Sequence, residues 1–299
     1  MHARRRSTSR YILPLIILIL LLATAVMLLF RRGSIKNLID PHEGQVYIYD
    51  GYDWVWMTPL EGIEVNTLTA DDFTEADGRI VYTGNDYTTR CGIDVSEHQH
   101  SIDWNSVKAD GVDYAYIRVG RRGYTEGGIF EDEYFEQNIK GALNAGLDVG
   151  VYFFSQAINA SEALEEAQFV LDHISGYDIS LPVMFDWEPV ESDSGARTDD
   201  LSREYATGCA IAFCEKIRLS GYEAGVYFNR TSGYYRFDLS KLTNYSWWFS
   251  LPEMGYPSFY YAVDMWQYSF TDAVNGIEGE TDMNMILTPI PHEEADTEA

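Results

Sequence analysis

The chain has 299 residues, of which 46% are hydrophobic and 14% are aromatic. This length and composition allow a sizeable buried core in one large domain, alone or with a small companion, and exclude disorder throughout the chain. Residues 1–36 hold seven basic residues and no acidic residue, so the remainder, with 14 basic and 47 acidic residues, carries a net charge of −33. Such an acidic surface argues against nucleic acid as a partner, although acidic residues also serve solubility.

Residues 11–30 form one apolar run without a charged residue, long enough to cross the roughly 30 Å hydrocarbon core of a bilayer. A cleaved signal peptide would have a shorter apolar centre and a small-residue cleavage site, whereas Arg31 and Arg32 follow this run directly. The pattern predicts a basic cytoplasmic tail at residues 1–10 and an uncleaved transmembrane anchor at residues 11–30. Four arginines before the run and three basic residues after it modestly favour a cytoplasmic N-terminus, which would leave the rest of the chain outside the cytoplasmic membrane, facing the cell wall.

Residues 31–88 have the pattern of a small β module or a stiff spacer. Short apolar stretches at 46–49 and 52–57 flank Asp50-Gly51, which is typical of a type I′ hairpin turn. A second Asp-Gly pair, Asp77-Gly78, precedes another short strand at 79–82. Nothing in this segment indicates chemistry.

Strands alternate with helices over residues 89–288, which we predict to be the catalytic domain. The expected strands are 114–119, 149–154, 182–186, 224–228 and 262–268, and the expected helices are 130–145, 161–174 and 201–219. This alternation predicts an α/β fold with a parallel sheet, most naturally closed into a (β/α) barrel of the TIM type.

Residues 289–299 are expected to be an acidic tail. The three cysteines have no paired spacing and are expected to be free thiols.

Four carboxylates stand at or just after the carboxyl ends of predicted strands, where a barrel gathers its active site: Asp94, Asp186, Glu188 and Asp282. Asp186 and Glu188 are two residues apart on an extended segment, so their side chains point to the same face. Ionisation of one raises the pKa of the other, so one can remain a protonated general acid while its neighbour stays charged. Glycoside hydrolysis requires this combination. The alternative is a pair of solvated loop carboxylates.

Six motifs in order resemble glycosyl hydrolase family 25, the lysozymes or N-acetylmuramidases, over residues 91–287. The residues are Asp94, Ser96 and Gln99 followed by Trp104; Tyr116-Ile117-Arg118; Gly150, Tyr152 and Phe154; Asp186 and Glu188; Trp266-Gln267-Tyr268; and Gly276 followed by Asp282 and Asn284. The resemblance implies a flattened, irregular barrel that cleaves the β-1,4 bond between N-acetylmuramic acid and N-acetylglucosamine in peptidoglycan, with retention of configuration.

The same resemblance implies roles for individual residues. Glu188 would be the general acid and base, and Asp186 would orient or stabilise the reacting N-acetyl group or the oxocarbenium centre. Asp94 and Asp282 would complete an acidic floor. A carboxylate nucleophile and the substrate's own acetamido group both remain open, with slight preference for substrate assistance.

The resemblance also implies positions that contact the sugar. Tyr152, Gln267 and Tyr268 match cleft residues, and Arg118 matches a residue near the floor. Trp248 is a further expected substrate contact. It stands on the seventh strand in a segment that departs from the family because it lacks a usual cleft tyrosine, so glycan contacts there are expected to differ.

Neither a cofactor nor a metal is expected, because His98 and His100 lack a third grouped ligand. The expected partners are peptidoglycan glycan strands and, through the anchor, the membrane. Two other functions stay open: a non-catalytic or weakly active glycan-binding module, and a hydrolase of another N-acetylated polysaccharide such as chitin.

Overall fold

The computed structural model describes residues 14, 16–28, 41–190, 192, 195–252 and 254–291. The predicted basic tail lies outside the described residues, as do both ends of the predicted anchor and most of the acidic tail. Residues 16–28 are helical. No helix in the described part of the chain is long and apolar enough to span a membrane. The chain divides into two compact units, Met1–Tyr49 with Trp54–Pro59, and Asp50–Asp53 with Leu60–Ala299.

The smaller unit contains a β-hairpin in which β1 (Val46–Tyr49) pairs antiparallel with β2 (Trp54–Met57). The hairpin confirms the predicted strand pair, but the predicted two-residue turn is wrong, because four residues, 50–53, separate the strands. Asp50 closes this longer loop by accepting hydrogen bonds at Oδ1 from the backbone N–H groups of Tyr52 and Asp53. Asp50 thus contributes through its side chain, while Gly51 has the positive φ, 112°, that the Asp-Gly pair predicts at that residue.

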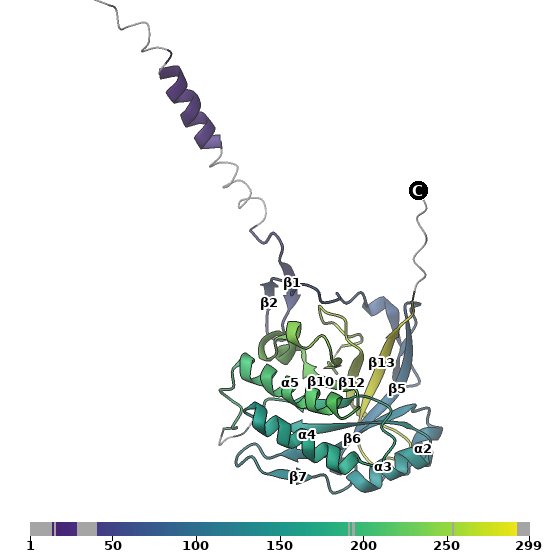
Figure 1. The fold of residues 1–299 in the computed structure, drawn as a ribbon. Coiled ribbons are helices and arrows are strands. Elements are labelled where there is room, and N and C mark those ends of the chain that lie inside the picture. Colours follow the sequence, from purple (N-terminus) through teal and green to yellow (C-terminus); the bar gives the residue numbers. More distant parts are fainter. Residues whose placement is uncertain are drawn as a thin grey trace, which may run out of the picture. The chain divides into compact units, whose positions relative to one another are not determined.

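The larger unit begins with a second hairpin and continues into a closed barrel (Figure 1). After the short helix η1 (Ala70–Asp72), β3 (Phe73–Ala76) pairs with β4 (Arg79–Tyr82) across Asp77-Gly78. Both turn residues have positive φ, 51° and 77°, as a two-residue type I′ turn requires.

Eight strands close the barrel. In order around the ring they are β5 (Tyr87–Val95), β13 (Thr281–Pro289), β12 (Met265–Asp272), β11 (Ser246–Ser250), β10 (Ala224–Asn229), β9 (Val183–Trp187), β8 (Asp148–Ser155) and β6 (Tyr114–Arg122), with β6 pairing back onto β5. Neighbouring strands are parallel except at β13, which runs antiparallel to both β12 and β5. The predicted barrel is confirmed, with one reversed strand.

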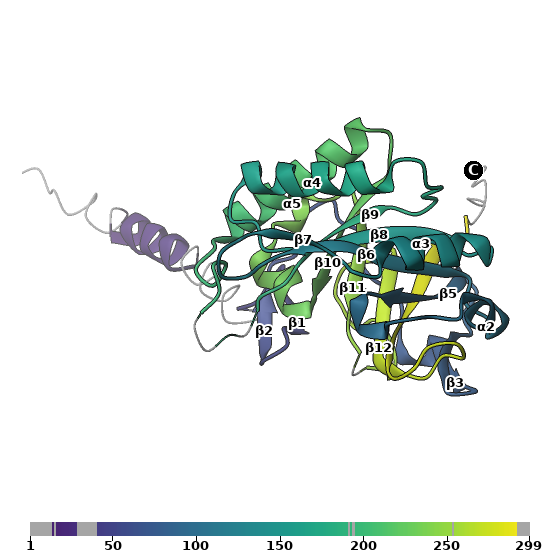
Figure 2. The same ribbon diagram turned by 90° about the horizontal axis from the view of Figure 1, so that it is seen from below.

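The helices cover the outside of the barrel. They are α2 (Trp104–Ala109), α3 (Phe135–Asn144), α4 (Ala160–Ile174) and α5 (Arg203–Leu219), with 3₁₀ or π turns at η2 (Glu97–Gln99), η3 (Ser232–Arg236) and η4 (Leu239–Lys241). Figures 1 and 2 both show α4 and α5 side by side on one flank. The described connections on either side of β11 contain no α-helix, which makes the barrel irregular.

The predicted helix at 130–145 starts too early. Its first residues belong instead to β7 (Ile129–Glu131), which pairs antiparallel with the end of β6. Asp132 follows β7 and accepts a hydrogen bond at Oδ1 from the backbone N–H of Tyr134, so the helix begins only at Phe135. The predicted helices at 161–174 and 201–219 agree with α4 and α5 to within two residues.

Large side chains fill the barrel interior and form a floor beneath the strand ends. The cluster comprises Tyr114, Tyr116, Tyr152, Met184, Tyr227, Trp248 and Met265. Glycines make room for these side chains: a Cβ on Gly92 would lie 2.2 Å from the ring of Tyr114, and a Cβ on Gly150 would lie 2.4 Å from the ring of Tyr116. The interior is therefore packed, and a ligand can enter only above this floor.

Candidate active site

The four predicted carboxylates meet at one end of the barrel and line a single cavity. Asp94 is the last residue but one of β5, Asp186 lies in β9, and Glu188 directly follows β9. Asp282 was predicted to follow a strand, but it lies near the start of β13, and the reversed direction of that strand brings it to the same end. The lining residues are Asp94, Val95, Ser96, His98, Gln99, Arg118, Tyr152, Phe154, Asp186, Glu188, Tyr227, Trp248, Gln267 and Asp282.

Asp94 is held by two amide donors from neighbouring strands. Its Oδ2 accepts hydrogen bonds from Nδ2 of Asn284 at 2.7 Å and from Nε2 of Gln267 at 2.8 Å. Burial raises the pKa of Asp94 to about 6, and these two hydrogen bonds oppose the rise because they favour the ionised form. The side chain of Asp94 is therefore held in place by two amide donors, both of which stabilise its ionised form.

Gln267 bridges two of the acids. Its Nε2 also donates to Oδ2 of Asp282 at 3.3 Å, and its Oε1 accepts a hydrogen bond of 2.8 Å from the hydroxyl of Tyr227. The carboxamide of Gln267, expected from the resemblance to contact sugar, is thus engaged within the protein. Sequence reasoning did not assign a role to Tyr227 or Asn284. The only available signal for Asn284 was its place two residues after Asp282.

Asp186 and Glu188 both face the cavity, as their spacing predicted. Asp186 is 6% exposed, and its Oδ1 is buried without a hydrogen-bond partner. Burial, followed by the charges of Glu188 and Asp94, raises the pKa of Asp186 well above its usual value. Burial and the charge of Asp94 raise the pKa of Glu188 to about 7. Near neutral pH, this pair therefore retains protons that an exposed pair would lose.

Asp282 belongs to the same electrostatic group. Burial raises its pKa to about 9, with further contributions from the charges of Asp94 and Glu188. Four carboxyl groups that disfavour one another's ionisation cannot all be charged at neutral pH. The cavity can therefore offer a proton donor and a carboxylate at the same time.

Arg118 lines the same cavity as the four acids and is held by two acidic partners. Its Nε donates to Oδ2 of Asp132 at 2.8 Å, and its Nη2 lies 3.0 Å from Oε1 of Glu97. The charge of Arg118 opposes the rise in the pKa of Asp186. The resemblance places Arg118 near the floor but does not reveal its acidic partners: Glu97 occupies a variable position of the Asp94–Gln99 motif, and Asp132 lies in another segment.

Tyr152 and Trp248 contribute to the aromatic floor of the cavity. The indole Nε1 of Trp248 donates to Oδ1 of Asn284 at 2.8 Å, and its ring lies 5.0 Å from that of Tyr227. Trp248 is only 1% exposed, so its ring forms the base of the cavity rather than a surface platform.

The structure does not bring Tyr268 to the cavity. Tyr268 follows Gln267 on β12, so its side chain points to the opposite face of the strand. There its ring lies 5.5 Å from that of Trp266, and 3% of the residue is exposed. Tyr268 is not among the residues that line the cavity, which argues against a sugar contact.

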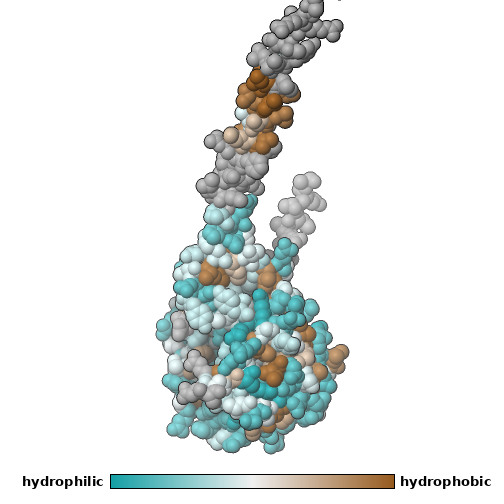
Figure 3. Space-filling model, turned by 90° about the vertical axis from the view of Figure 1, so that its left-hand side faces the viewer, coloured by the Kyte–Doolittle hydropathy of each residue, from teal (hydrophilic) through white to brown (hydrophobic). Residues whose placement is uncertain are grey.

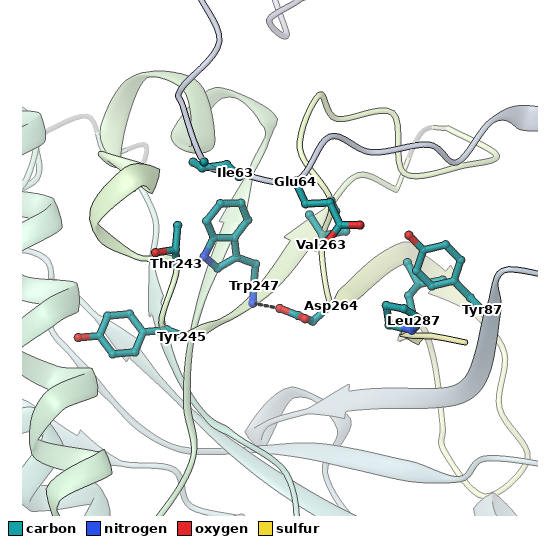
Figure 4. Close-up of a pocket in the computed structure, with 12 residues that line it drawn as sticks. Ile63, Glu64, Tyr87, Thr243, Tyr245, Trp247, Val263, Asp264 and Leu287 are labelled. Atoms are coloured by element: carbon teal, nitrogen blue, oxygen red, sulfur yellow. Dashed lines mark hydrogen bonds between the residues drawn. The ribbon is translucent and has the colours of Figure 1, made fainter. Parts of the chain in front are cut away.

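A second cavity lies at the opposite end of the barrel (Figure 4). Trp247, at the start of β11, and Leu287, near the end of β13, line it together with Glu64 and Asp264. Asp264 accepts a hydrogen bond of 2.7 Å from the backbone N–H of Trp247 and so joins the starts of two strands. Only two carboxylates line this cavity, against four in the first.

Among the residues that the structure describes, no three His, Cys, Asp or Glu side chains are grouped to hold a metal ion.

The sequence model of glycosyl hydrolases family 25 matches residues 93–277. The chain is 31% identical over 204 residues to lysozyme M1 of Streptomyces globisporus and 28% identical over 194 residues to the autolytic lysozyme of Clostridium acetobutylicum, each match covering 64% of this chain. The chain spans 66% and 54%, respectively, of the lengths of these two relatives.

Solved structures share the fold. A modular autolysin of Streptococcus pneumoniae aligns with a TM-score of 0.60 at 21% identity, over 81% of this chain and 56% of that one. A bacterial lysozyme of Streptomyces coelicolor aligns with a TM-score of 0.54 at 25% identity, over 66% of this chain and 91% of that one.

Proposed function

Because the chain belongs to glycosyl hydrolase family 25, we propose that it hydrolyses peptidoglycan at the β-1,4 bond between N-acetylmuramic acid and N-acetylglucosamine. The observation that carries the proposal is the meeting of Asp94, Asp186, Glu188 and Asp282 in one cavity. The relatives named as lysozymes, and the S. pneumoniae autolysin, whose structure has also been solved with a synthetic peptidoglycan ligand, support this choice of polymer.

Glu188 is the proposed general acid and base. A pKa of about 7 leaves it partly protonated near neutral pH, so it can donate a proton to the departing sugar oxygen. Having lost that proton, Glu188 can then accept one from the water that completes hydrolysis. Its position at the mouth of the barrel, directly after β9, supports both steps.

Asp186 is the proposed partner of the substrate's acetamido group. Its buried Oδ1 has no hydrogen-bond partner within the protein, and an amide N–H from the substrate would satisfy it. An acetamido group held in this way can attack the sugar carbon itself, which gives retention of configuration without a carboxylate nucleophile. Asp94, with its two amide donors, and Asp282 complete the acidic floor beneath the developing positive charge.

Two other functions use the same cavity. A non-catalytic glycan-binding module would bind peptidoglycan without cutting it, and a hydrolase of another N-acetylated polysaccharide would cut chitin instead. The raised pKa values of Asp186 and Glu188 favour an enzyme over a receptor, since catalysis needs a proton donor near neutral pH and binding alone does not. The altered segment at Trp248 leaves the choice of polysaccharide to experiment.

The test uses the full chain on purified peptidoglycan and on chitin oligosaccharides, with mass spectrometry of the released sugars. Glu188→Gln removes the proposed acid, and Glu75→Gln, at an exposed position in β3, is the matched control. We expect muropeptides with muramic acid at the reducing end from the wild type and the control only. Binding without cleavage by the wild type would contradict the enzyme, and cleavage of chitin alone would contradict the substrate.

We also propose that residues 11–30 anchor the chain in the cytoplasmic membrane as a single pass, with the catalytic unit outside. The support is the uncharged run in the sequence and the exposure of its described part, where large apolar side chains between Ile16 and Leu28 lie at the surface (Figure 3). Membrane fractionation and protease treatment of intact cells test both claims. Leu20→Arg with Leu22→Arg should move the chain out of the membrane fraction, since each arginine costs about 2.5–3.5 kcal/mol at a span centre. Persistent membrane association of this variant would contradict the anchor.

A further inference from the structure

Gln156 is a buried residue beside the proposed general acid that none of the roles above uses. It directly follows β8, whose last residue, Ser155, pairs with Trp187 at the end of β9. The next residues along these two strands are Gln156 and Glu188, so they are neighbours just beyond the sheet. Gln156 is 0% exposed.

The carboxamide of Gln156 joins three segments of the chain. Its Nε2 donates to the backbone carbonyl of Glu188 at 2.7 Å and to that of Ser155 at 2.9 Å. Its Oε1 accepts a hydrogen bond of 2.9 Å from the hydroxyl of Thr198. One side chain thus extends the pairing of β8 with β9 by one residue and connects it to the segment that returns towards α5.

Both supports of Gln156 are themselves fixed. Thr198 is 2% exposed, and Arg197 before it forms an ion pair of 2.7 Å with Glu162 on α4. Ser155 donates a hydrogen bond of 2.6 Å to the buried carboxylate of Glu166, also on α4. Both partners of Gln156 are therefore tied to α4, Ser155 directly and Thr198 through the neighbouring Arg197.

We propose that Gln156 is a positioning residue for Glu188: its hydrogen bond to the Glu188 carbonyl holds the end of β9 so that the Glu188 side chain stays inside the cavity. The inference rests on the proposed function, in which Glu188 is the acid and base. Without this bond the Glu188 carbonyl would lose its hydrogen bond from Gln156, and the carboxyl group could move towards solvent. A misplacement of about 1 Å can lower a rate about a hundredfold.

Gln156→Met in the full chain tests the proposal, because methionine has a similar length and cannot form these hydrogen bonds. Gln168→Met, on the exposed face of α4, is the matched control. We expect kcat on peptidoglycan to fall about 10- to 100-fold for Gln156→Met with KM nearly unchanged. Thr198→Val should lower kcat to a smaller extent, and Thr198→Ser, which keeps the hydroxyl, should restore it. If Gln156→Met does not fold, the comparison of kcat between Thr198→Val and Thr198→Ser tests the proposal.

A second measurement separates positioning from a merely structural role and needs no turnover. The Glu188 carboxyl group is followed by carbon-13 NMR during a pH titration of the full chain. In the wild type we expect a midpoint near 7. In Gln156→Met, the midpoint should fall towards that of an ordinary glutamate, because the carboxyl group becomes solvated. An unchanged midpoint, or an unchanged kcat, would overturn the proposal. If the wild type does not cut peptidoglycan, the proposed function fails while this titration still tests the position of Glu188.

Discussion

The side-chain amide of Asn284 in β13 donates a hydrogen bond of 2.7 Å to Oδ2 of Asp94 in β5. The two residues are 190 positions apart in the sequence and lie on neighbouring strands of the barrel. This bond favours the ionised form of Asp94 in a site where burial opposes ionisation. The proton distribution among the four acids therefore depends on a neutral side chain.

Replacement of Asn284 should consequently change the acid side of the pH dependence. In Asn284→Ala, Asp94 loses one of its two donors, so its pKa should rise above about 6. We expect the acid limb of kcat/KM to move to higher pH, while Asn144→Ala at an exposed position leaves it unchanged. An acid limb at the wild-type pH in the Asn284 variant would show that Asp94 does not control it.

The wild type should have a narrow pH optimum. Activity requires Asp94 ionised, which fails as pH falls through about 6, and Glu188 protonated, which fails as pH rises through about 7. Measurement of kcat/KM on peptidoglycan between about pH 4 and pH 9 should give a bell-shaped curve with its maximum between these values. Full activity at the alkaline end of this range would exclude Glu188 as the proton donor.

Tyr227 should contribute to activity through Gln267. Tyr227→Phe removes the hydroxyl that donates to Oε1 of Gln267 and frees the carboxamide to turn away from Asp94 and Asp282. One hydrogen bond of this kind contributes about 0.5–1.5 kcal/mol, so kcat/KM should fall about two- to tenfold. Tyr205→Phe, at a residue 60% exposed on α5, serves as the control and should behave like the wild type.

Asp282→Asn should stabilise the fold while it lowers activity. The pKa of Asp282 is raised to about 9 in the folded chain from 3.8, so this residue lowers the free energy of unfolding progressively as pH rises from about 4 to about 9 and has no such effect below that window. Asparagine has no charge to bury. At pH 8 we expect a higher Tm, by about 2–4 °C for each kcal/mol recovered, and at pH 3 no gain. An equal gain at both pH values would point to packing instead.

Much of the site could be predicted because its acids follow apolar strands. Asp94 and the Asp186-Glu188 pair stand where a strand ends, and parallel strands bring those ends together. Asp282 was placed correctly for the wrong reason, since the sequence does not reveal that β13 runs antiparallel. Strand direction depends on which neighbours a strand pairs with, and a local pattern carries no such information.

The remaining misses also have physical causes. Tyr227 looks like a core residue and does belong to the core, so its sequence context did not reveal the hydrogen bond from its hydroxyl to Gln267. Tyr268 shares a motif with Gln267 but faces the other side of its strand. Gln156 offered no signal, because its function depends on a carbonyl group that any residue at position 188 would provide.

The reversed strand β13 has a consequence for the order in which the protein can be made. It closes the barrel by pairing with β5 from Asp282 opposite Asp94 to Pro289 opposite Tyr87. At about 5–20 residues per second, β5 leaves the ribosome roughly 10–40 s before the strand that completes the ring. Throughout that interval Asp94 lacks Asn284, and one edge of β5 is unpaired. The nascent chain can therefore assemble the first seven strands of the barrel but acquires its complete acidic floor only when the last strand emerges.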